Sequence, residues 1–161
     1  MGVSACGKST IGAVLAEKMG LPFQDGDSLH PPGNIEKMEQ GIALQDEDRW
    51  PWLARVGEEF GQSNGMVIAC SALKKAYRDL IAEKAGRPVT FIHLVGTREL
   101  LTERMGQRSG HFMPTSLLES QLATLETPAA DERVVTVDID ADVETIVARA
   151  MSGLAKQEEE K

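Results

Sequence analysis

The sequence predicts an α/β domain in which a parallel β-sheet is covered by helices on both faces. Short apolar runs alternate along the chain with longer segments of helical spacing, a pattern typical of repeated strand–helix–strand units. Hydrophobic residues make up 42% of the 161 residues, so the chain can bury a substantial core. No internal repeat divides the sequence, and we expect residues 1–161 to form a single domain.

The expected elements follow one another in a regular order. Four short apolar runs are expected to be strands, at residues 21–24, 66–70, 89–95 and 134–139. Seven longer segments are expected to be helices, at residues 8–19, 34–40, 50–62, 73–84, 97–107, 115–125 and 142–151. Residues 108–114 are expected to form an irregular loop within a lid at about 106–116, and the charged tail 154–161 is expected to be disordered.

Charge and composition exclude several classes of protein. The net charge of −8 argues against a general nucleic-acid-binding protein, which needs a basic surface. The two cysteines, Cys6 and Cys70, make no disulfide framework, which favours a reducing compartment. The apolar runs are too short to span a bilayer, and no signal-peptide pattern is visible. We therefore expect a soluble cytoplasmic protein with no nucleic-acid or membrane partner.

Residues 2–9, GVSACGKS, match the phosphate-loop pattern GxxxxGK(S/T). Glycines let such a loop curl so that its N–H groups converge on phosphate oxygens, and the following helix adds its positive N-terminal end. We expect Lys8 to reach the β- and γ-phosphates of ATP as a catalytic residue, and Ser9 to bind Mg²⁺. The predicted ATP-binding residues here are Gly2, Val3, Ser4, Ala5, Cys6, Gly7, Lys8, Ser9 and Thr10.

The segment ahead of this loop departs from the usual arrangement. A phosphate loop follows a strand, whereas the printed sequence begins at Met1, directly before the loop. We therefore expect the first, central strand of the sheet to be missing from this chain. A sequence recorded from too late a start would explain the absence, and the loop would then be weakly anchored.

Two aspartates follow the first expected strand. Asp25 and Asp27 come directly after residues 21–24, and ligands of parallel sheets bind at the carboxyl ends of the strands. A carboxylate there can accept a hydrogen bond, or a proton, from a substrate hydroxyl. Paired aspartates are also common in turns and helix caps, so this motif alone leaves both interpretations open.

Several long strings narrow the interpretation. They are DGDSLHPPGNIEKMEQGIALQDEDRWPWL at residues 25–53, CSALKKAYRD at 70–79, GHFMP at 110–114 and SQLATLE at 120–126. Together they strongly resemble the gluconokinases of the small P-loop type, over about residues 1–151. The resemblance implies a fold related to shikimate and nucleoside monophosphate kinases. It also implies transfer of the ATP γ-phosphate to the 6-hydroxyl of D-gluconate, a need for Mg²⁺, and a homodimer.

The resemblance and the chemistry of a sugar acid together suggest the substrate-binding residues. We expect Asp27 to accept the proton of the 6-hydroxyl as a catalytic residue, Asp25 to meet Mg²⁺ through water, and Arg49 to bind the substrate carboxylate. A surface ion pair with residues 46–48 is the alternative for Arg49. The full expected substrate-binding set is Asp27, His30, Arg49, Lys74, Arg78 and Gln121.

Two arginines flank the irregular loop. Arg108, as a catalytic residue, and Arg104 are expected to contact the nucleotide when the lid closes, with solvated helix charges as the alternative. Two other functions remain open: a related kinase acting on shikimate or a nucleotide, and a truncated, inactive nucleotide-binding domain. The segment 25–53 favours the gluconate kinase.

Overall fold

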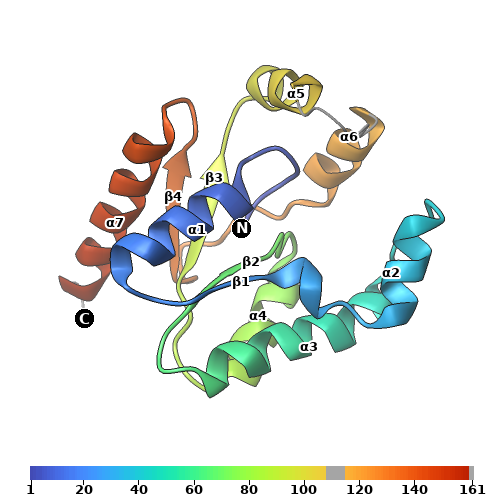
Figure 1. The fold of residues 1–161 in the computed structure, drawn as a ribbon, viewed down its shortest axis with the longest axis horizontal. Coiled ribbons are helices and arrows are strands. Elements are labelled where there is room, and N and C mark those ends of the chain that lie inside the picture. Colours follow the sequence, from blue (N-terminus) through green and yellow to red (C-terminus); the bar gives the residue numbers. More distant parts are fainter. Residues whose placement is uncertain (108–114, 160–161) are drawn as a thin grey trace.

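The computed structural model describes residues 1–107 and 115–159 and has the α/β architecture expected from the sequence (Figure 1). Its strands are β1 (Phe23–Asp25), β2 (Val67–Ala69), β3 (Phe91–Val95) and β4 (Val134–Asp138). Its helices are α1 (Lys8–Met19), the 3₁₀ helix η1 (Gly26–Leu29), α2 (Pro32–Glu39), α3 (Asp46–Gln62), α4 (Lys75–Ala85), α5 (Arg98–Gly106), α6 (Thr115–Thr124) and α7 (Val143–Glu159). None of the described helices is both long and apolar enough to cross a membrane.

The strands form two separate parallel pairs. β1 pairs with β2, with Phe23 opposite Val67, and β3 pairs with β4, with Phe91 opposite Val134. The parallel direction of the strands, which the sequence predicts, is confirmed. Helix α1 packs against β1 and β2 and also against α7, so it connects the two pairs (Figure 1).

Met1 and Gly2 lie between the two strand pairs. The Met1 nitrogen donates to the Ile92 carbonyl at 2.6 Å, and the Leu94 N–H donates to the Met1 carbonyl at 3.0 Å. The Gly2 N–H donates to the carbonyl of Ser71, just after β2, at 3.1 Å.

The apolar core is divided in the same way as the strands. A larger cluster packs β3 and β4 against α1, α5 and α7, with Leu94 and Val147 among its members. A smaller cluster lies along α3 and α4 and includes Trp52, Leu53 and Ile81. The fold therefore consists of two packed halves, each built around one strand pair.

Two helices differ from the prediction by four or more residues at one end. α3 begins at Asp46, four residues earlier than expected, because the Asp48 carboxylate accepts the Gln45 N–H at 2.9 Å and closes the first turn. α7 continues to Glu159, so the tail that was expected to be disordered is helical as far as that residue. Leu154 packs against the larger core cluster, which explains why the helix continues.

Candidate active site

The phosphate loop is shaped by local backbone conformation. Gly7 has a φ of 92°, which favours glycine, and the chain also turns at Ala5, with a φ of 68°. Gly2 allows close packing, because a Cβ there would lie 2.9 Å from the Sγ of Cys6. Helix α1 begins at Lys8, so its first, unpaired N–H groups point towards the loop. This geometry suits the binding of phosphate oxygens.

The side chain of Lys8 folds back over the backbone of the phosphate loop. The Nζ of Lys8 donates to the Val3 carbonyl at 3.1 Å. Residues 3–6 are buried, whereas Ser9 and Thr10 at the start of α1 are exposed. The Lys8 ammonium therefore lies where the charge of a bound phosphate would need neutralisation.

The side chains of Ser9 and Asp25 meet beside the loop. The Ser9 hydroxyl donates to one oxygen of Asp25 at 3.0 Å, which links α1 to the end of β1. The other oxygen of Asp25 accepts the Asp27 N–H at 3.0 Å and caps η1. A hydroxyl beside a carboxylate is an oxygen pair of the kind that Mg²⁺ binds together with phosphate and water. The residues predicted to hold Mg²⁺ therefore fit that ion.

The turn that carries Asp27 is held by α3. The Nε1 of Trp52 donates to the Gly26 carbonyl at 2.8 Å, and the indole is buried. A Cβ on Gly26 would lie 2.4 Å from the Ala69 carbonyl oxygen, so the turn packs tightly on the end of β2. The exposed Asp27 side chain is thus presented on a fixed turn next to the Ser9–Asp25 pair.

A second polar cluster forms where α3 meets the start of α4. Arg49 Nη1 lies 3.4 Å from one oxygen of Asp46 and donates to the Tyr77 hydroxyl at 3.1 Å. Lys74 Nζ lies 3.4 Å from the other oxygen of Asp46. The Tyr77 hydroxyl donates to the first oxygen, the one beside Arg49. The two cations lie 5.7 and 5.6 Å from the Tyr77 ring centroid. Arg49 and Lys74 are therefore brought together, and the Arg49 ion pair named as the alternative is also present.

Electrostatic interactions within this cluster shift the pKa values of its members. The hydrogen bond from Tyr77, followed by the charges of Lys74 and Arg49, holds the pKa of Asp46 below its usual range. Tyr77 and Asp46 raise the pKa of Lys74. Burial and the bond to Asp46 raise the pKa of Tyr77. At neutral pH the cluster holds two cations and one carboxylate, and this net positive charge suits a carboxylate ligand.

Two other predicted residues contact backbone groups. Gln121 on α6 accepts the Ser4 N–H at 2.6 Å, so it contacts the phosphate loop in this structure. Arg104 on α5 donates to the Ile139 carbonyl, just after β4, at 2.7 Å. Arg108 lies outside the described residues.

The structure corrects the prediction that His30 binds the substrate. Its side chain is 5% exposed and stacks on Trp52 with 4.1 Å between ring centroids. The Asn34 amide donates to its Nδ1 at 3.1 Å, and burial lowers the pKa of the ring. His30 therefore packs behind Trp52 and supports the turn that carries Asp27.

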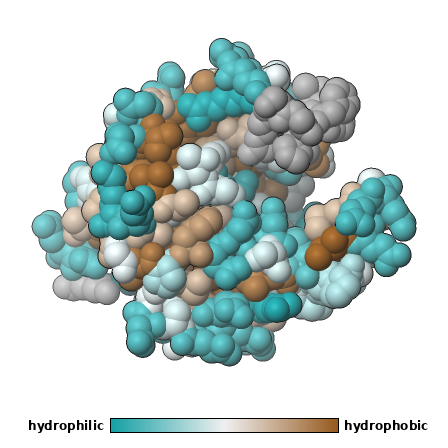
Figure 2. Space-filling model, viewed as in Figure 1, coloured by the Kyte–Doolittle hydropathy of each residue, from teal (hydrophilic) through white to brown (hydrophobic). Residues whose placement is uncertain are grey.

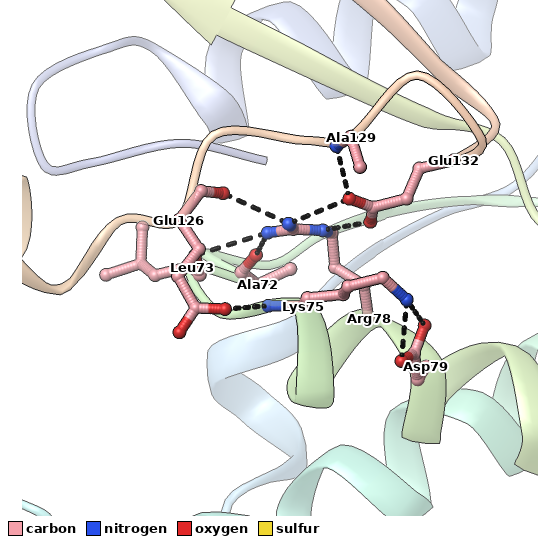
Figure 3. A network of polar contacts seen from close by, with 8 residues as sticks. All are labelled: Ala72, Leu73, Lys75, Arg78, Asp79, Glu126, Ala129 and Glu132. Carbon is pink, nitrogen blue, oxygen red and sulfur yellow. Dashed lines mark hydrogen bonds and ion pairs between the residues drawn. The ribbon is translucent and has the colours of Figure 1, made fainter.

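The structure also corrects the prediction for Arg78. Its guanidinium, 1% exposed, donates to the two carboxylate oxygens of Glu132 at 2.7 and 3.2 Å (Figure 3). It also donates to the carbonyls of Ala72, Leu73 and Glu126. These bonds use all the N–H donors of a guanidinium. Arg78 therefore ties the segment after β2 to the segment before β4, and no donor is left for a substrate.

Comparisons with known proteins show the family to which this chain belongs. The shikimate kinase family model matches residues 4–151. The gluconokinase of Gluconobacter oxydans is 48% identical over 141 residues, which cover 85% of this chain and 79% of that protein. The thermosensitive gluconokinase of Escherichia coli is 46% identical over 151 residues, covering 91% of this chain and 80% of that protein. This chain belongs to the gluconokinase family.

Solved structures of kinases have folds similar to that of this gluconokinase-family chain. A crystal structure of a gluconokinase from Sinorhizobium meliloti has a TM-score of 0.92 and 50% sequence identity, with 99% of this chain and 91% of that chain covered. A shikimate kinase from Aquifex aeolicus has a TM-score of 0.63 at 15% identity, covering 98% of this chain and 94% of that chain. The second likeness shows the shared fold alone.

Three side chains of this gluconokinase-family site were not predicted to support it. Asp46 and Tyr77 each lie three residues from a predicted cation, Arg49 and Lys74, a spacing that places both members of a pair on one side of a helix. That spacing is a signal that could have found them. Trp52 carries no comparable local signal, because its bond to Gly26 depends on how α3 packs against η1.

Proposed function

We propose that this chain transfers the γ-phosphoryl group of ATP to the 6-hydroxyl of D-gluconate, giving 6-phospho-D-gluconate and ADP. The observation that carries the proposal is a continuous row of contacts. Ser9 of α1 contacts Asp25, and Trp52 holds the following turn. The helix of Trp52 also carries Arg49, which meets Lys74 around Tyr77. A phosphate site and a carboxylate site joined in this way suit an acceptor with a terminal hydroxyl and a carboxylate, and relatives named gluconokinase support it.

The loop of residues 2–9 provides the nucleotide side of the proposed site. Its N–H groups and Lys8 bind the β- and γ-phosphates, and Ser9 and Asp25 hold Mg²⁺. Mg²⁺, when bound, neutralises charge on the phosphates. Arg104, which lies beside the turn after β4, and Arg108 contact the nucleotide from the lid.

The cationic cluster provides the acceptor side. Arg49 offers a planar fork for the gluconate carboxylate, and Lys74 adds a second positive charge. Asp46 pairs with both cations and holds them in place. The substrate carboxylate would compete with Asp46 for them. Gluconate hydroxyls would be bound between this cluster and Asp27.

The proposed transfer is an in-line displacement. The 6-hydroxyl oxygen forms a bond to the γ-phosphorus while the bond from that phosphorus to the β,γ-bridging oxygen breaks, and ADP leaves with the electron pair. Asp27 accepts the hydroxyl proton and orients the oxygen. Because positioning and charge neutralisation dominate phosphoryl transfer, Lys8 contributes more than Asp27 to the rate.

The proposal includes a cytoplasmic homodimer. Ile35, Met38 and Ile42, on and just after α2, are 40, 44 and 49% exposed. Figure 2 shows hydrophobic surface at this arm, on the right of the molecule. Such a surface supports contact with a second copy. Light scattering during size-exclusion chromatography tests it, because a chain of 17.5 kDa would elute at twice that mass.

A coupled assay that measures ADP tests the function. Purified protein is given ATP and Mg²⁺ with D-gluconate, shikimate or a nucleoside monophosphate. Turnover with gluconate alone is expected. Turnover only with shikimate or a nucleotide, or nucleotide binding without turnover, would contradict the proposal.

Asp27→Asn tests the proposed acceptor of the proton. We expect kcat to fall by about 100-fold with little change in the KM for ATP, because the amide cannot take the proton but leaves the loop intact. Asp79→Asn, an exposed carboxylate on α4 that pairs with Lys75, is the control and should keep normal kcat. An unchanged kcat in Asp27→Asn would remove Asp27 from the mechanism.

A further inference from the structure

The turn that leads to Lys74 has a strained backbone. Ala72, just after β2, is 1% exposed and has a φ of 46°, which residues other than glycine rarely adopt. Strain of this kind persists only where surrounding contacts hold it, and it is concentrated at functional sites. Arg78 provides one such contact, because its guanidinium donates to the Ala72 and Leu73 carbonyls. The backbone that enters Lys74 is therefore held in a fixed conformation.

Lys74 also occupies the N-cap position of α4, where a lysine is unusual. The residues preferred there carry an oxygen that accepts a free N–H of the first turn. A lysine side chain has no acceptor, and Lys74 makes no such bond. Its ammonium lies instead beside Asp46 and 5.6 Å from the Tyr77 ring centroid. The chain thus has a cation at this position in place of a capping group.

Glu126 supplies the missing acceptor from a distant part of the chain. One of its carboxylate oxygens accepts the Lys75 N–H, the first of α4, at 3.1 Å (Figure 3). Its own N–H donates to the Leu73 carbonyl at 2.8 Å, and its carbonyl accepts from Arg78 at 3.0 Å. Glu126 therefore bonds both the residue before Lys74 and the residue after it.

Glu126 is itself held by the half of the molecule that contains the larger core. It lies just after α6, whose Leu118 is 1% exposed within that core. Gln121 on the same helix accepts the Ser4 N–H of the phosphate loop at 2.6 Å. The same short segment of chain therefore contacts the phosphate loop and the turn that carries Lys74.

We propose that Glu126 is a positioning residue, which caps α4 and thereby holds the Lys74 ammonium where it binds the carboxylate of the acceptor. The inference rests on the proposed function for the identity of that acceptor. Without the Glu126 carboxylate, the first turn of α4 loses its acceptor, and Lys74 is free to turn away from Arg49. The backbone bond to Leu73 remains, so the change affects the position of one cation and leaves the fold intact.

Steady-state kinetics with gluconate test the proposal. Glu126→Ala should raise the KM for gluconate about threefold and leave kcat and the KM for ATP unchanged, because losing a cap displaces one cation. Glu126→Gln should restore a normal KM, since its amide oxygen can accept the same N–H. Glu119→Ala, on α6 and paired with Arg98 at the surface, is the matched control and should keep a normal KM. In a Lys74→Met background, Glu126→Ala should cause no further rise.

Tyr77 gives a second readout, which requires no activity. It is the one tyrosine of the 161 residues, so NMR of tyrosine-labelled protein observes this cluster alone. The ring signals should shift in Glu126→Ala and in Lys74→Met, and should keep their positions in Glu126→Gln.

Three results would overturn the proposal. They are unchanged Tyr77 signals in Glu126→Ala, an unchanged KM for gluconate in that variant, and an equal rise in KM when Lys74 is already methionine. An original chain that turns over no gluconate would contradict the proposed function instead. The Tyr77 signals would then still decide whether Glu126 positions Lys74.

Discussion

Each of the two halves of this molecule is built on a pair of parallel strands. The halves differ in the size of their apolar core and in the site residues that lie beside it. The half with β3 and β4 holds the larger core, and the buried loop residues Val3, Ala5 and Cys6 belong to that core. The half with β1 and β2 holds a smaller core around Trp52, and the polar residues Asp27 and Arg49 lie beside it. One half therefore supports the phosphate loop, and the other supports the residues that we propose bind the acceptor.

This difference puts the proposed phosphoryl transfer at the boundary between the halves. Polar contacts cross that boundary, and two of them involve charged side chains of interest. Ser9 meets Asp25 at 3.0 Å, and Arg78 of α4 meets Glu132 before β4 at 2.7 Å. In the proposed reaction, ATP and the acceptor are bound by different halves. These contacts therefore have to hold the two halves in a fixed relative position.

The largest expected effect comes from breaking the Arg78 contact. In Arg78→Met, the Glu132 carboxylate and three carbonyl groups lose their partner in a buried site, and we expect a loss of about 3–5 kcal/mol in the free energy of unfolding. Urea unfolding measures it. Lys75→Met, on the same helix and in an exposed pair with Asp79, is the matched control and should change stability little. Equal losses in the two variants would mean that Arg78 does not join the halves.

Lys8→Ala tests the nucleotide side of the comparison. We expect kcat to fall by about 100- to 1,000-fold, because the cation that neutralises the transferred phosphoryl group is lost. Steady-state kinetics at saturating gluconate measure it. Lys18→Ala, on the same helix and paired with Glu144 at the surface, should retain activity. Near-normal activity of Lys8→Ala would make the phosphate-loop assignment untenable.

His93, on β3, is expected to make the stability of the fold depend on pH. Burial, with smaller contributions from the Met1 amine and Arg78, lowers the pKa of His93 to about 4. The unfolded chain binds a proton at this histidine below about pH 6.5, whereas the folded chain stays neutral to about pH 4. Stability from the neutral ring is thus fully present above pH 6.5 and is lost as the pH falls towards 4.

The size of this effect is measured by comparison with His93→Gln. Between pH 7 and 4.5 the original chain should lose about 2–3 kcal/mol more unfolding free energy than the variant, as urea titrations at each pH would show. Parallel pH dependence in the two chains would contradict a buried, neutral His93.

The smallest expected effect concerns the acceptor side. Arg49→Met should raise the KM for gluconate by about tenfold and leave the KM for ATP unchanged, because one of two carboxylate-binding cations is lost. Arg55→Met, an exposed arginine on the same helix, is the control. A rise in the KM for ATP instead would assign Arg49 to the other half of the site.

Much of the fold was predictable from local pattern. The alternation of apolar runs and helical segments located every strand and seven helices, because burial of one face or stripe imposes those periods on the sequence. The start of α3 and the extent of α7 were wrong. One depends on the Asp48 carboxylate reaching back to Gln45, and the other on Leu154 finding a place in the core. Neither contact can be recognised from the periodic spacing of apolar residues in the sequence.

The candidate site also has a part that the sequence predicts and a part that depends on tertiary structure. The phosphate loop and the adjacency of Asp25 and Asp27 were determined by the sequence alone, since eight consecutive residues and one turn contain all the atoms involved. The fate of the distant cations was decided only by tertiary structure. Arg49 and Lys74 meet around Tyr77 with one net positive charge, whereas Arg78, one helical turn further along, is fully paired with Glu132. The residue type is the same for Arg49, which we propose binds substrate, and for the structural Arg78, and the partners that packing brings to each arginine make the difference.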